Sequence, residues 1–293
     1  MRYSYFPGCS LHGMASEYDL SFKAVCKAMD IQLEEVKDWN CCGTGPKVAK
    51  SKLLAIALPV QNLVQVEKGT SREVLMPCAS CFSTHKNALH QIERDPDLKK
   101  KIDQILEEQY QGTVKISHPL EILTANGGLR KIKSLVKRKL EGLKVVCYYG
   151  CLLTRPPKVM KFDHYEYPLS MDKIMDALEI ESLDWSYKTE CCGASLAVSQ
   201  PELVLKLCHD ILTDAKARGA EAIVTACPLC HGNLDARQEQ IEARFSAKLQ
   251  MPVFYFTQLM GLAFGCDIRE LGLHKHLVEP SALLAQKGLN IQL

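Results

Sequence analysis

Two pairs of adjacent cysteines are the chemical feature around which this chain is organised. Cys41-Cys42-Gly43 returns later in the chain as Cys191-Cys192-Gly193. Adjacent cysteines do not readily bond to each other, because a vicinal disulfide strains the ring away from normal disulfide geometry. Both sulfurs of a pair can instead face one point that holds several metal ions. We therefore interpret each pair as the centre of a thiolate metal site.

Each pair belongs to a set of five cysteines, and the two sets have nearly the same spacing. The sets are Cys9, Cys41, Cys42, Cys78 and Cys81, and then Cys151, Cys191, Cys192, Cys227 and Cys230. Corresponding positions are separated by 142, 150, 149 and 149 residues. A glycine precedes the first cysteine of each set, and another glycine follows each pair. This repetition predicts two equivalent metal sites.

The number of ligands favours iron–sulfur clusters over zinc. Structural zinc is satisfied by four ligands in tetrahedral geometry, whereas each set here offers five thiolates. Iron–sulfur clusters use soft thiolates and have several irons to ligate. Zinc stays open as a minor alternative. A thiol–disulfide relay is less favoured, because it would leave the adjacent pair and the upstream cysteine without a role.

Short apolar runs precede the cysteines, and they predict the elements that position them. We expect strands at 2–6, 31–36, 73–76, 113–116, 143–149, 181–184, 222–225 and 252–256. Helical patterns are found at 16–29, 47–66, 82–92, 95–110, 170–178, 203–218, from the last cysteine to about 247, and at 257–264. This alternation predicts an α/β fold with mostly parallel sheets, and ligands at the carboxyl ends of strands are typical of that architecture.

The chain is long enough for two such domains, which we place at residues 1–140 and 141–293. Asn126-Gly127-Gly128 and a basic segment at 131–139 lie near their junction. The basic segment could be a docking surface, although a solvated helix face is the favoured interpretation.

Composition excludes several classes of function. A net charge of +2 gives no reason to expect nucleic acid or an anionic membrane as a partner. The start of the chain has no apolar signal segment, and no apolar run reaches the roughly 18 residues of a spanning helix. We therefore expect a soluble cytoplasmic protein. In such a reducing compartment, fourteen cysteines indicate metal ligands or catalytic thiols rather than disulfides.

The cysteine pattern resembles the cysteine-rich CCG domain, and the two copies together resemble the B subunit of heterodisulfide reductase. The resemblance runs from Tyr5 to about Phe256, and its one departure is a slightly short spacer of 34 residues before Cys227. Iron–sulfur subunits of glycolate oxidase, of lactate-oxidising complexes and of some quinone-linked reductases are related. By this resemblance, each five-cysteine set would hold a noncubane [4Fe-4S] cluster.

The resemblance also implies an activity and partners. The family reduces the disulfide of coenzyme M and coenzyme B between its two clusters, so the chain would be an oxidoreductase acting on a sulfur group. Its expected partners in the same complex are two further subunits, one small and ferredoxin-like and the other flavin-containing, with a hydrogenase or formate dehydrogenase beyond them. The sequence contains neither a ferredoxin cysteine run nor a Gly-x-Gly-x-x-Gly fingerprint, so electrons must come from such partners. The alternative is a non-catalytic electron-transfer subunit of a bacterial complex, which would be a relative of heterodisulfide reductase, an electron-bifurcating complex or a dehydrogenase.

Three residues beside the cysteines are candidates for substrate binding. Arg155 could bind an anionic group of a substrate, and a surface ion pair is an equally good interpretation. His12 and His231 could deliver protons near neutral pH, although a lone histidine is more often merely hydrogen-bonded. The cysteines outside the two sets, Cys26, Cys147, Cys208 and Cys266, are expected to be small buried hydrophobic residues.

Overall fold

Two four-stranded parallel sheets form the framework of the computed structural model, which describes residues 1–44 and 51–289. The strand orders are β2-β1-β3-β4 and β6-β5-β7-β8, and each neighbouring pair runs parallel. The strands are β1 (Arg2–Tyr5), β2 (Gln32–Glu35), β3 (Glu73–Leu75), β4 (Lys115–Ser117), β5 (Lys144–Tyr148), β6 (Glu181–Ser182), β7 (Ala222–Thr225) and β8 (Val253–Tyr255). The predicted α/β class with two repeated, mostly parallel sheets is confirmed.

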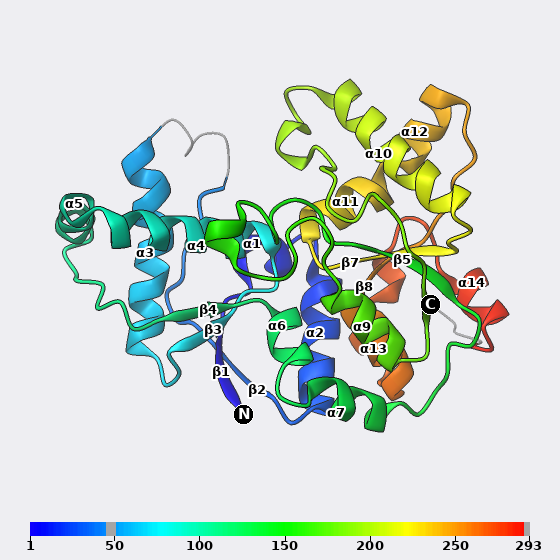
Figure 1. Ribbon diagram of the computed structural model, residues 1–293, viewed down its shortest axis with the longest axis horizontal. Helices are drawn as coiled ribbons and strands as arrows, with labels where there is room; N and C mark the ends of the chain where they lie inside the picture. Colours follow the sequence, from blue (N-terminus) through cyan, green and yellow to red (C-terminus); the bar gives the residue numbers. More distant parts are fainter. Residues whose placement is uncertain (45–50, 290–293) are drawn as a thin grey trace.

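Helices surround both sheets (Figure 1). In the first half they are α1 (Gly8–His12), α2 (Ser16–Ala28), α3 (Lys52–Lys68), α4 (Ala79–Arg94), α5 (Pro96–Leu106), α6 (Pro119–Thr124) and α7 (Gly128–Leu135). In the second half they are α8 (Pro157–Met160), α9 (Ser170–Ala177), α10 (Pro201–Ala217), α11 (Pro228–Ala236), α12 (Gln238–Phe245), α13 (Phe256–Phe264) and α14 (Ser281–Gln286), with short 3-10 turns η2 (Ala194–Leu196), η3 (Ile268–Leu271) and η4 (Leu273–Lys275).

Several helix starts have the capping chemistry that their sequence predicts. The Ser51 hydroxyl accepts a hydrogen bond from the backbone N–H of Leu54 at 3.3 Å, and the Asp95 carboxylate accepts one from Leu98 at 2.9 Å. Pro96 and Pro201 occupy the first turns of α5 and α10, where the missing proline N–H costs no helical hydrogen bond.

The strand order determines where the cysteine loops meet. The first strand of each half, β1 or β5, lies between the second and third strands of its sheet. The loops that leave the carboxyl ends of these three strands therefore converge at one edge. In each half those three loops carry the five cysteines of one set. The topology thus gathers ligands that are about 70 to 80 residues apart in the sequence.

The two halves pack against each other in a reciprocal way. Helix α2 of the first half lies against α13 of the second, and α9 of the second half lies against α6 of the first. At the α2–α13 contact the rings of Tyr18 and Tyr255 stack with centroids 4.2 Å apart, and the hydroxyls of Ser21 and Thr257 lie 2.7 Å apart. The apolar residues of both halves join in one continuous core. The halves are therefore held in a fixed orientation by buried contacts.

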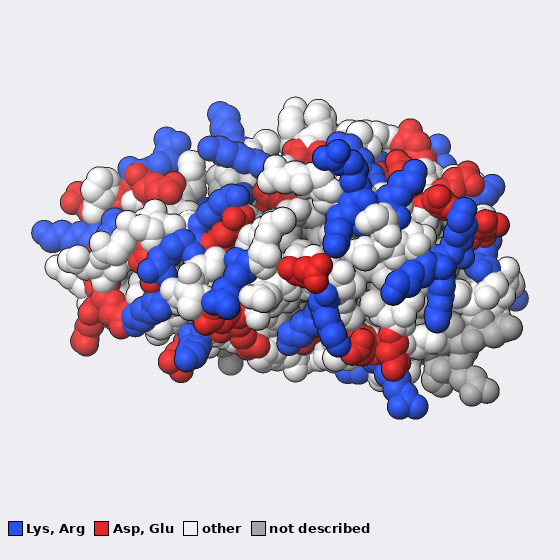
Figure 2. All heavy atoms as spheres, turned by 90° about the horizontal axis from the view of Figure 1, so that it is seen from below, with Lys and Arg blue, Asp and Glu red and all other residues white. Residues whose placement is uncertain are grey.

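Acidic and basic side chains are interspersed on the face that lies at the bottom of Figure 1 (Figure 2). Two lysines of the basic segment make ion pairs, Lys131 with Asp30 at 3.4 Å and Lys139 with Glu179 at 2.8 Å. Within the described residues no helix is both long enough and apolar enough to cross a membrane.

Two expected helices differ from the structure. The helix expected from the last cysteine to about 247 is divided at Arg237 into α11 and α12. The basic segment leaves α7 at Val136, because the backbone N–H groups of Lys137 and Arg138 both donate to the carbonyl of Ala263, at 2.8 and 3.0 Å. That contact caps the carboxyl end of α13. Residues 47–50 of the expected helix at 47–66 lie outside the described residues, and α3 covers the rest.

Candidate metal centres

The first cysteine set comes together at the carboxyl edge of the first sheet. Cys9 lies in α1 after β1, Cys41 and Cys42 follow β2, and Cys78 immediately precedes α4, which contains Cys81. The sulfurs of Cys9 and Cys41 are 3.6 Å apart, and those of Cys42 and Cys81 are 3.5 Å apart. Cys81 in turn lowers the pKa of Cys78, so all five thiols interact as one group.

The second set repeats this arrangement at the edge of the second sheet. The sulfurs of Cys151 and Cys191 are 3.9 Å apart, and those of Cys192 and Cys230 are 3.6 Å apart. Cys227 immediately precedes α11, and with Cys192 it raises the pKa of Cys230. The structure therefore places the ten predicted ligands in two groups of five.

The thiols of each group differ in their pKa values. A hydrogen bond from Cys81 lowers the pKa of Cys42 to about 7, and one from Cys151 lowers the pKa of Cys191 to about 6. Burial raises the pKa of Cys9 to about 11. Neighbouring thiolates repel one another, so five sulfurs this close cannot all ionise unless a cation compensates their charge. Metal binding and loss of thiol protons are therefore coupled at both sites.

Two glycines bring the backbone close to the innermost sulfurs. Gly8 has φ +68° and Gly150 has φ +67°, a conformation that glycine adopts readily. A Cβ atom would lie 2.8 Å from the sulfur of Cys81 at Gly8 and 2.9 Å from that of Cys230 at Gly150. The glycine before the first cysteine of each set, visible in the sequence, is thus required by the shape of the sulfur group.

The donor set fits an iron–sulfur cluster. Each group supplies five soft sulfur donors from three loops, which exceeds the four ligands of a closed zinc site. Each group also has a buried side and an open side. Cys42 and Cys81 are buried, whereas Cys9 and Cys41 are exposed. A bound group would therefore be accessible from one direction.

A hydrogen-bond donor beside each pair was not anticipated from the sequence. The side-chain amide of Asn233 lies 3.7 Å from the sulfur of Cys192 and donates to its carbonyl at 3.0 Å. In the first half, the Thr84 side chain adds to the hydrogen bond from Cys81 in lowering the pKa of Cys42. Both residues come three positions after the last cysteine of their set, which places them one helical turn further along the same face. That spacing was the available signal.

A buried ion pair supports the second site. Lys188 is 1% exposed, and its ammonium group lies 2.7 Å from the carboxylate of Asp172. The other oxygen of that carboxylate accepts from the Tyr149 hydroxyl at 2.6 Å. The carbonyl of Lys188 accepts from the backbone N–H groups of Tyr149 and Gly150, at 2.8 and 3.1 Å. The loop before Cys191 is thereby held against the turn before Cys151.

The three candidate substrate residues lie in three different environments. His12 is exposed and lies 3.2 Å from Glu35, with its ring against Trp39 at 5.1 Å. The guanidinium of Arg155 donates to the hydroxyl of Thr189 at 3.1 Å, close to the second cysteine pair.

His231, the third candidate, is 5% exposed and stacks on Tyr255 with ring centroids 4.3 Å apart. Its Nδ1 atom lies 4.0 Å from Glu17 on α2. The structure therefore places His12 and Arg155 beside the cysteine loops and His231 at the buried contact between the halves.

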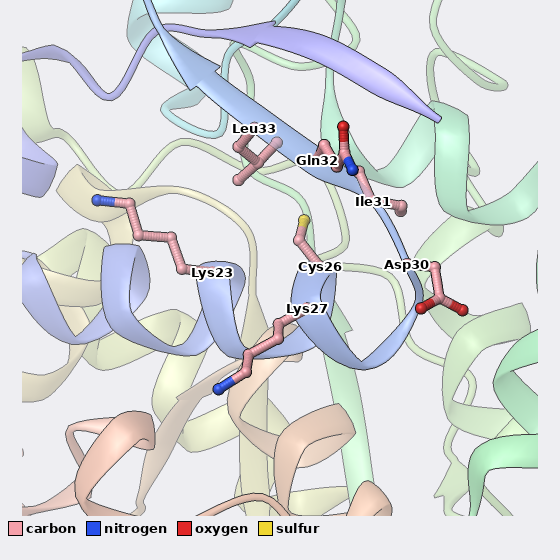
Figure 3. A pocket seen from close by; sticks show the side chains of 7 residues that line it. All are labelled: Lys23, Cys26, Lys27, Asp30, Ile31, Gln32 and Leu33. Carbon is pink, nitrogen blue, oxygen red and sulfur yellow. The ribbon is translucent and has the colours of Figure 1, made fainter.

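The cysteines outside the sets are mostly buried. Cys26, Cys147 and Cys208 are at most 1% exposed, and Cys266 is partly exposed. Figure 3 shows the sulfur of Cys26 directed from α2 toward the strand that carries Gln32 and Leu33, beside a pocket of about 380 Å³. Burial raises the pKa of Cys26, so this thiol stays protonated and unreactive.

Comparison with known proteins agrees with this geometry. The model of the CCG family, described as "Cysteine-rich domain", matches residues 3–85 and 145–235. The chain is 31% identical over 285 residues to the 8-methylmenaquinol:fumarate reductase membrane anchor subunit of Wolinella succinogenes, covering 96% of this chain and 99% of that one. It is 29% identical over 292 residues to the B subunit of the ferredoxin/F420H2-dependent CoB-CoM heterodisulfide reductase of Methanosarcina acetivorans, covering 97% and 96%.

A crystal structure of a hypothetical protein from Helicobacter pylori has the same fold, with a TM-score of 0.77 and 12% identity. The alignment covers 95% of this chain and 52% of that one, so this chain spans about half of its length. The resemblance expected from the cysteine spacing is confirmed, and it indicates iron–sulfur clusters as the cofactors. The chain belongs to the CCG cysteine-rich domain family.

Proposed function

We propose that the chain is the catalytic iron–sulfur subunit of a complex of the heterodisulfide reductase type. The observation that carries this proposal is the adjacency of the two cysteine groups. Helix α1, which contains Cys9, packs against α11, which contains Cys230. Helix α8, just after Cys151, packs against α4, which contains Cys81. Each group thus borders the other across the contact between the halves, where a small molecule could lie between them.

Reduction of a disulfide needs two electrons and two protons and yields two thiols. A noncubane [4Fe-4S] cluster in each group would supply one electron at a time and an iron as Lewis acid for a product sulfur. The ten cysteines hold these two cofactors in the proposal, and their exposed members (Cys9, Cys41 and Cys191) face the open side. CoM-S-S-CoB or a related disulfide is the proposed substrate class.

Other residues of the chain have proposed roles in binding and proton transfer. Arg155 is oriented by Thr189 beside the second cysteine pair, where its guanidinium can bind an anionic group of the substrate. His12 lies beside Glu35 near the first group and can pass a proton to a departing thiolate. His231 is buried, so its proposed role as a proton donor requires transfer through neighbouring groups.

Electrons must arrive from partner subunits. The proposed partners are a ferredoxin-like protein and a flavin-containing protein, as in complexes of the heterodisulfide reductase type. A second candidate function is electron transfer without catalysis in a quinol-linked complex. The specific observation in its favour is the name of the Wolinella succinogenes relative, which is part of a quinol:fumarate reductase.

Paramagnetic resonance on anaerobically purified, oxidised protein would separate the two functions. For disulfide reduction, addition of coenzyme M or coenzyme B thiol should produce a new cluster signal, because a product thiol binds at the site. A spectrum unchanged by both thiols, together with clusters that are reduced by quinol in the intact complex, would favour electron transfer alone.

Metal content provides a separate test of the cofactors. We expect about eight irons per chain with matching acid-labile sulfide, from two four-iron clusters. Cys41→Ala and Cys192→Ala should each remove one cluster and leave the other. Loss of both clusters from either substitution would mean a single shared site, and stoichiometric zinc without sulfide would contradict the assignment.

A further inference from the structure

A second group of metal-type donors lies outside the cysteine sets. His231, Asp235 and His276 are all buried, and one potential ligand atom from each lies within 4.8 Å of the others. The two imidazole rings meet edge to face, with centroids 5.1 Å apart. Two nitrogen donors and a carboxylate are a set that divalent transition metals bind.

The fold positions these three side chains from two segments. His231 and Asp235 are four residues apart on α11, so they share one face of the helix, turned away from Cys230 and Asn233. His276 ends the short turn η4. The Asp235 carboxylate holds the chain just after it, by accepting hydrogen bonds from the backbone N–H groups of Leu277 at 2.8 Å and Val278 at 3.2 Å.

Two ring nitrogens in this group are buried without a hydrogen-bond partner among the described residues. They are Nε2 of His231, a residue that is 5% exposed, and Nδ1 of His276, which is 8% exposed. Buried polar atoms nearly always have a partner, so each exception needs an explanation. Two such nitrogens within one cluster that also contains a carboxylate point to a shared ligand.

Gln258 provides the partner of one ring nitrogen of His276. The Gln258 amide nitrogen donates to the carbonyl of Leu271 at 3.0 Å, and its oxygen accepts from the backbone of Tyr255 at 2.9 Å. Both ends of this amide also lie near Nε2 of His276, the nitrogen at 2.9 Å and the oxygen at 3.1 Å, so Nε2 has a partner in either tautomer. Nδ1 has none among the described residues, and in the tautomer that is protonated at Nε2 it presents the lone pair that binds a metal.

A carboxylate also lies near the ring of His231. Its Nδ1 is 4.0 Å from the Glu17 carboxylate, a distance longer than a hydrogen bond. Metal-bound histidines usually donate their second N–H to a carboxylate or carbonyl, and a closer approach of Glu17 would supply that partner. Glu17 belongs to α2 in the first half, whereas the three donors belong to the second half. The group therefore lies where the two halves meet.

We propose that His231, Asp235 and His276 bind one divalent cation of the zinc class, which ties the carboxyl-terminal segment to the contact between the halves. The charges of Asp235 and Glu17 balance a doubly charged ion, and both imidazoles contribute as neutral ligands. Zinc bonds to nitrogen and oxygen of about 2.0–2.2 Å require the three donor atoms to draw together by roughly an ångström. The site uses no cysteine, so its test is separate from that of the proposed function, although a zinc-bound His231 would not also serve as the proton donor proposed above.

Zinc content and zinc-edge X-ray absorption of the anaerobically purified full chain test the proposal, after one equivalent of ZnCl₂ and gel filtration. We expect one retained zinc with a first shell of nitrogen and oxygen at about 2.0–2.1 Å. A first shell of sulfur at about 2.3 Å would place the zinc in a cysteine group and overturn the proposal. Failure to retain zinc would also overturn it. These measurements need no variant.

Substitutions then assign the ligands. His276→Gln should abolish zinc retention while iron and acid-labile sulfide stay unchanged, and His274→Gln, at an exposed position two residues away, should retain the metal. Glu17→Gln should weaken zinc binding roughly tenfold, as expected for a partner outside the ligand shell. Zinc retained by folded His276→Gln with an unchanged absorption spectrum would contradict the assignment.

Discussion

The ammonium group of Lys188 lies 2.7 Å from the carboxylate of Asp172 in the interior beneath the second cysteine group. Among the described residues the first half has no equivalent pair, because the corresponding position is Asp38, which is exposed and has φ +51°. The two cysteine groups are therefore alike in their ligands but differ in the polar contacts that support them. Lys188 also contacts the rings of Tyr149 and Tyr167, at 5.9 and 4.9 Å.

Lys188→Met should be strongly destabilising. Removal of one partner from a buried ion pair leaves the other charge buried and uncompensated, which typically costs about 3–5 kcal/mol. Urea unfolding of the full chain under anaerobic conditions would measure the loss. The matched control is Lys206→Met, because Lys206 pairs with Asp210 at the same 2.7 Å on an exposed helix face. That change should leave the stability almost unaltered, and equal losses in both variants would contradict the interpretation.

Gly150→Ala should remove the second cluster and spare the first. The added Cβ would lie 2.9 Å from the sulfur of Cys230. Gly142→Ala is a matched control, because Gly142 has φ +68° but no atom within 4 Å of the added carbon. Both variants carry the backbone strain of about 1 kcal/mol or more, and only one displaces a ligand. Iron analysis should show about half the normal iron in Gly150→Ala and full iron in Gly142→Ala; full iron in both would mean that the sulfur can yield.

The cysteine ligands and the strand ends that present them could be predicted from the sequence, because cysteine spacing and short apolar runs are local signals. Asn233 and Thr84 were missed, although their position three residues after a ligand carried a signal. Lys188 had no signal at all, since a lysine is normally exposed and only the tertiary fold buries it beside Asp172.

The packing of the two halves could not be predicted from the sequence either. The stacking of Tyr18 on Tyr255 joins residues that lie in different halves of the chain. His231 was considered because it follows Cys230, yet its neighbours are Glu17 and Tyr255 from elements far away in the sequence. Adjacency to Cys230 in the sequence does not determine these surroundings, because successive residues on a helix point about 100° apart.

Asn233→Leu should lower the reduction potential of the second cluster. Its amide lies 3.7 Å from the Cys192 sulfur, and a donor to a ligating sulfur stabilises the more negative, reduced state. We expect a decrease on the order of tens of millivolts, since a tenfold change in a one-electron equilibrium corresponds to about 59 mV. A redox titration followed by paramagnetic resonance would measure it.

Thr84→Val supplies the reciprocal experiment, because the Thr84 side chain helps to lower the pKa of Cys42 in the first group. This variant should lower the potential of the first cluster and leave the second unchanged. The two substitutions together would therefore assign each signal to its half. If either substitution shifted the potentials of both clusters, the two side chains would not act on separate clusters. If neither substitution shifted any potential, these side chains would not tune the clusters at all.

Stability should fall as the pH is lowered below 6.5, in part through His118. Burial lowers the pKa of this histidine to about 3 from its ordinary 6.5. Its Nε2 donates to the carbonyl of Pro77 at 3.0 Å, and its Nδ1 accepts from the backbone N–H of Leu120 at 3.2 Å, so the neutral ring is required. The folded pKa is the lower one, so the unfolded chain binds more protons between pH 6.5 and 3 and gains stability there relative to the folded state.

From this linkage, His118 alone should remove about 2 kcal/mol of unfolding free energy between pH 6.5 and pH 5. Urea unfolding at both pH values, in wild type and in His118→Gln, would isolate its share. The variant should be less stable at pH 6.5 but lose less on acidification. His164→Gln, at an exposed position, tests whether replacement of any histidine has this effect. If His118→Gln retained the wild-type dependence on pH, the buried ring would already be accessible to protons in the folded state.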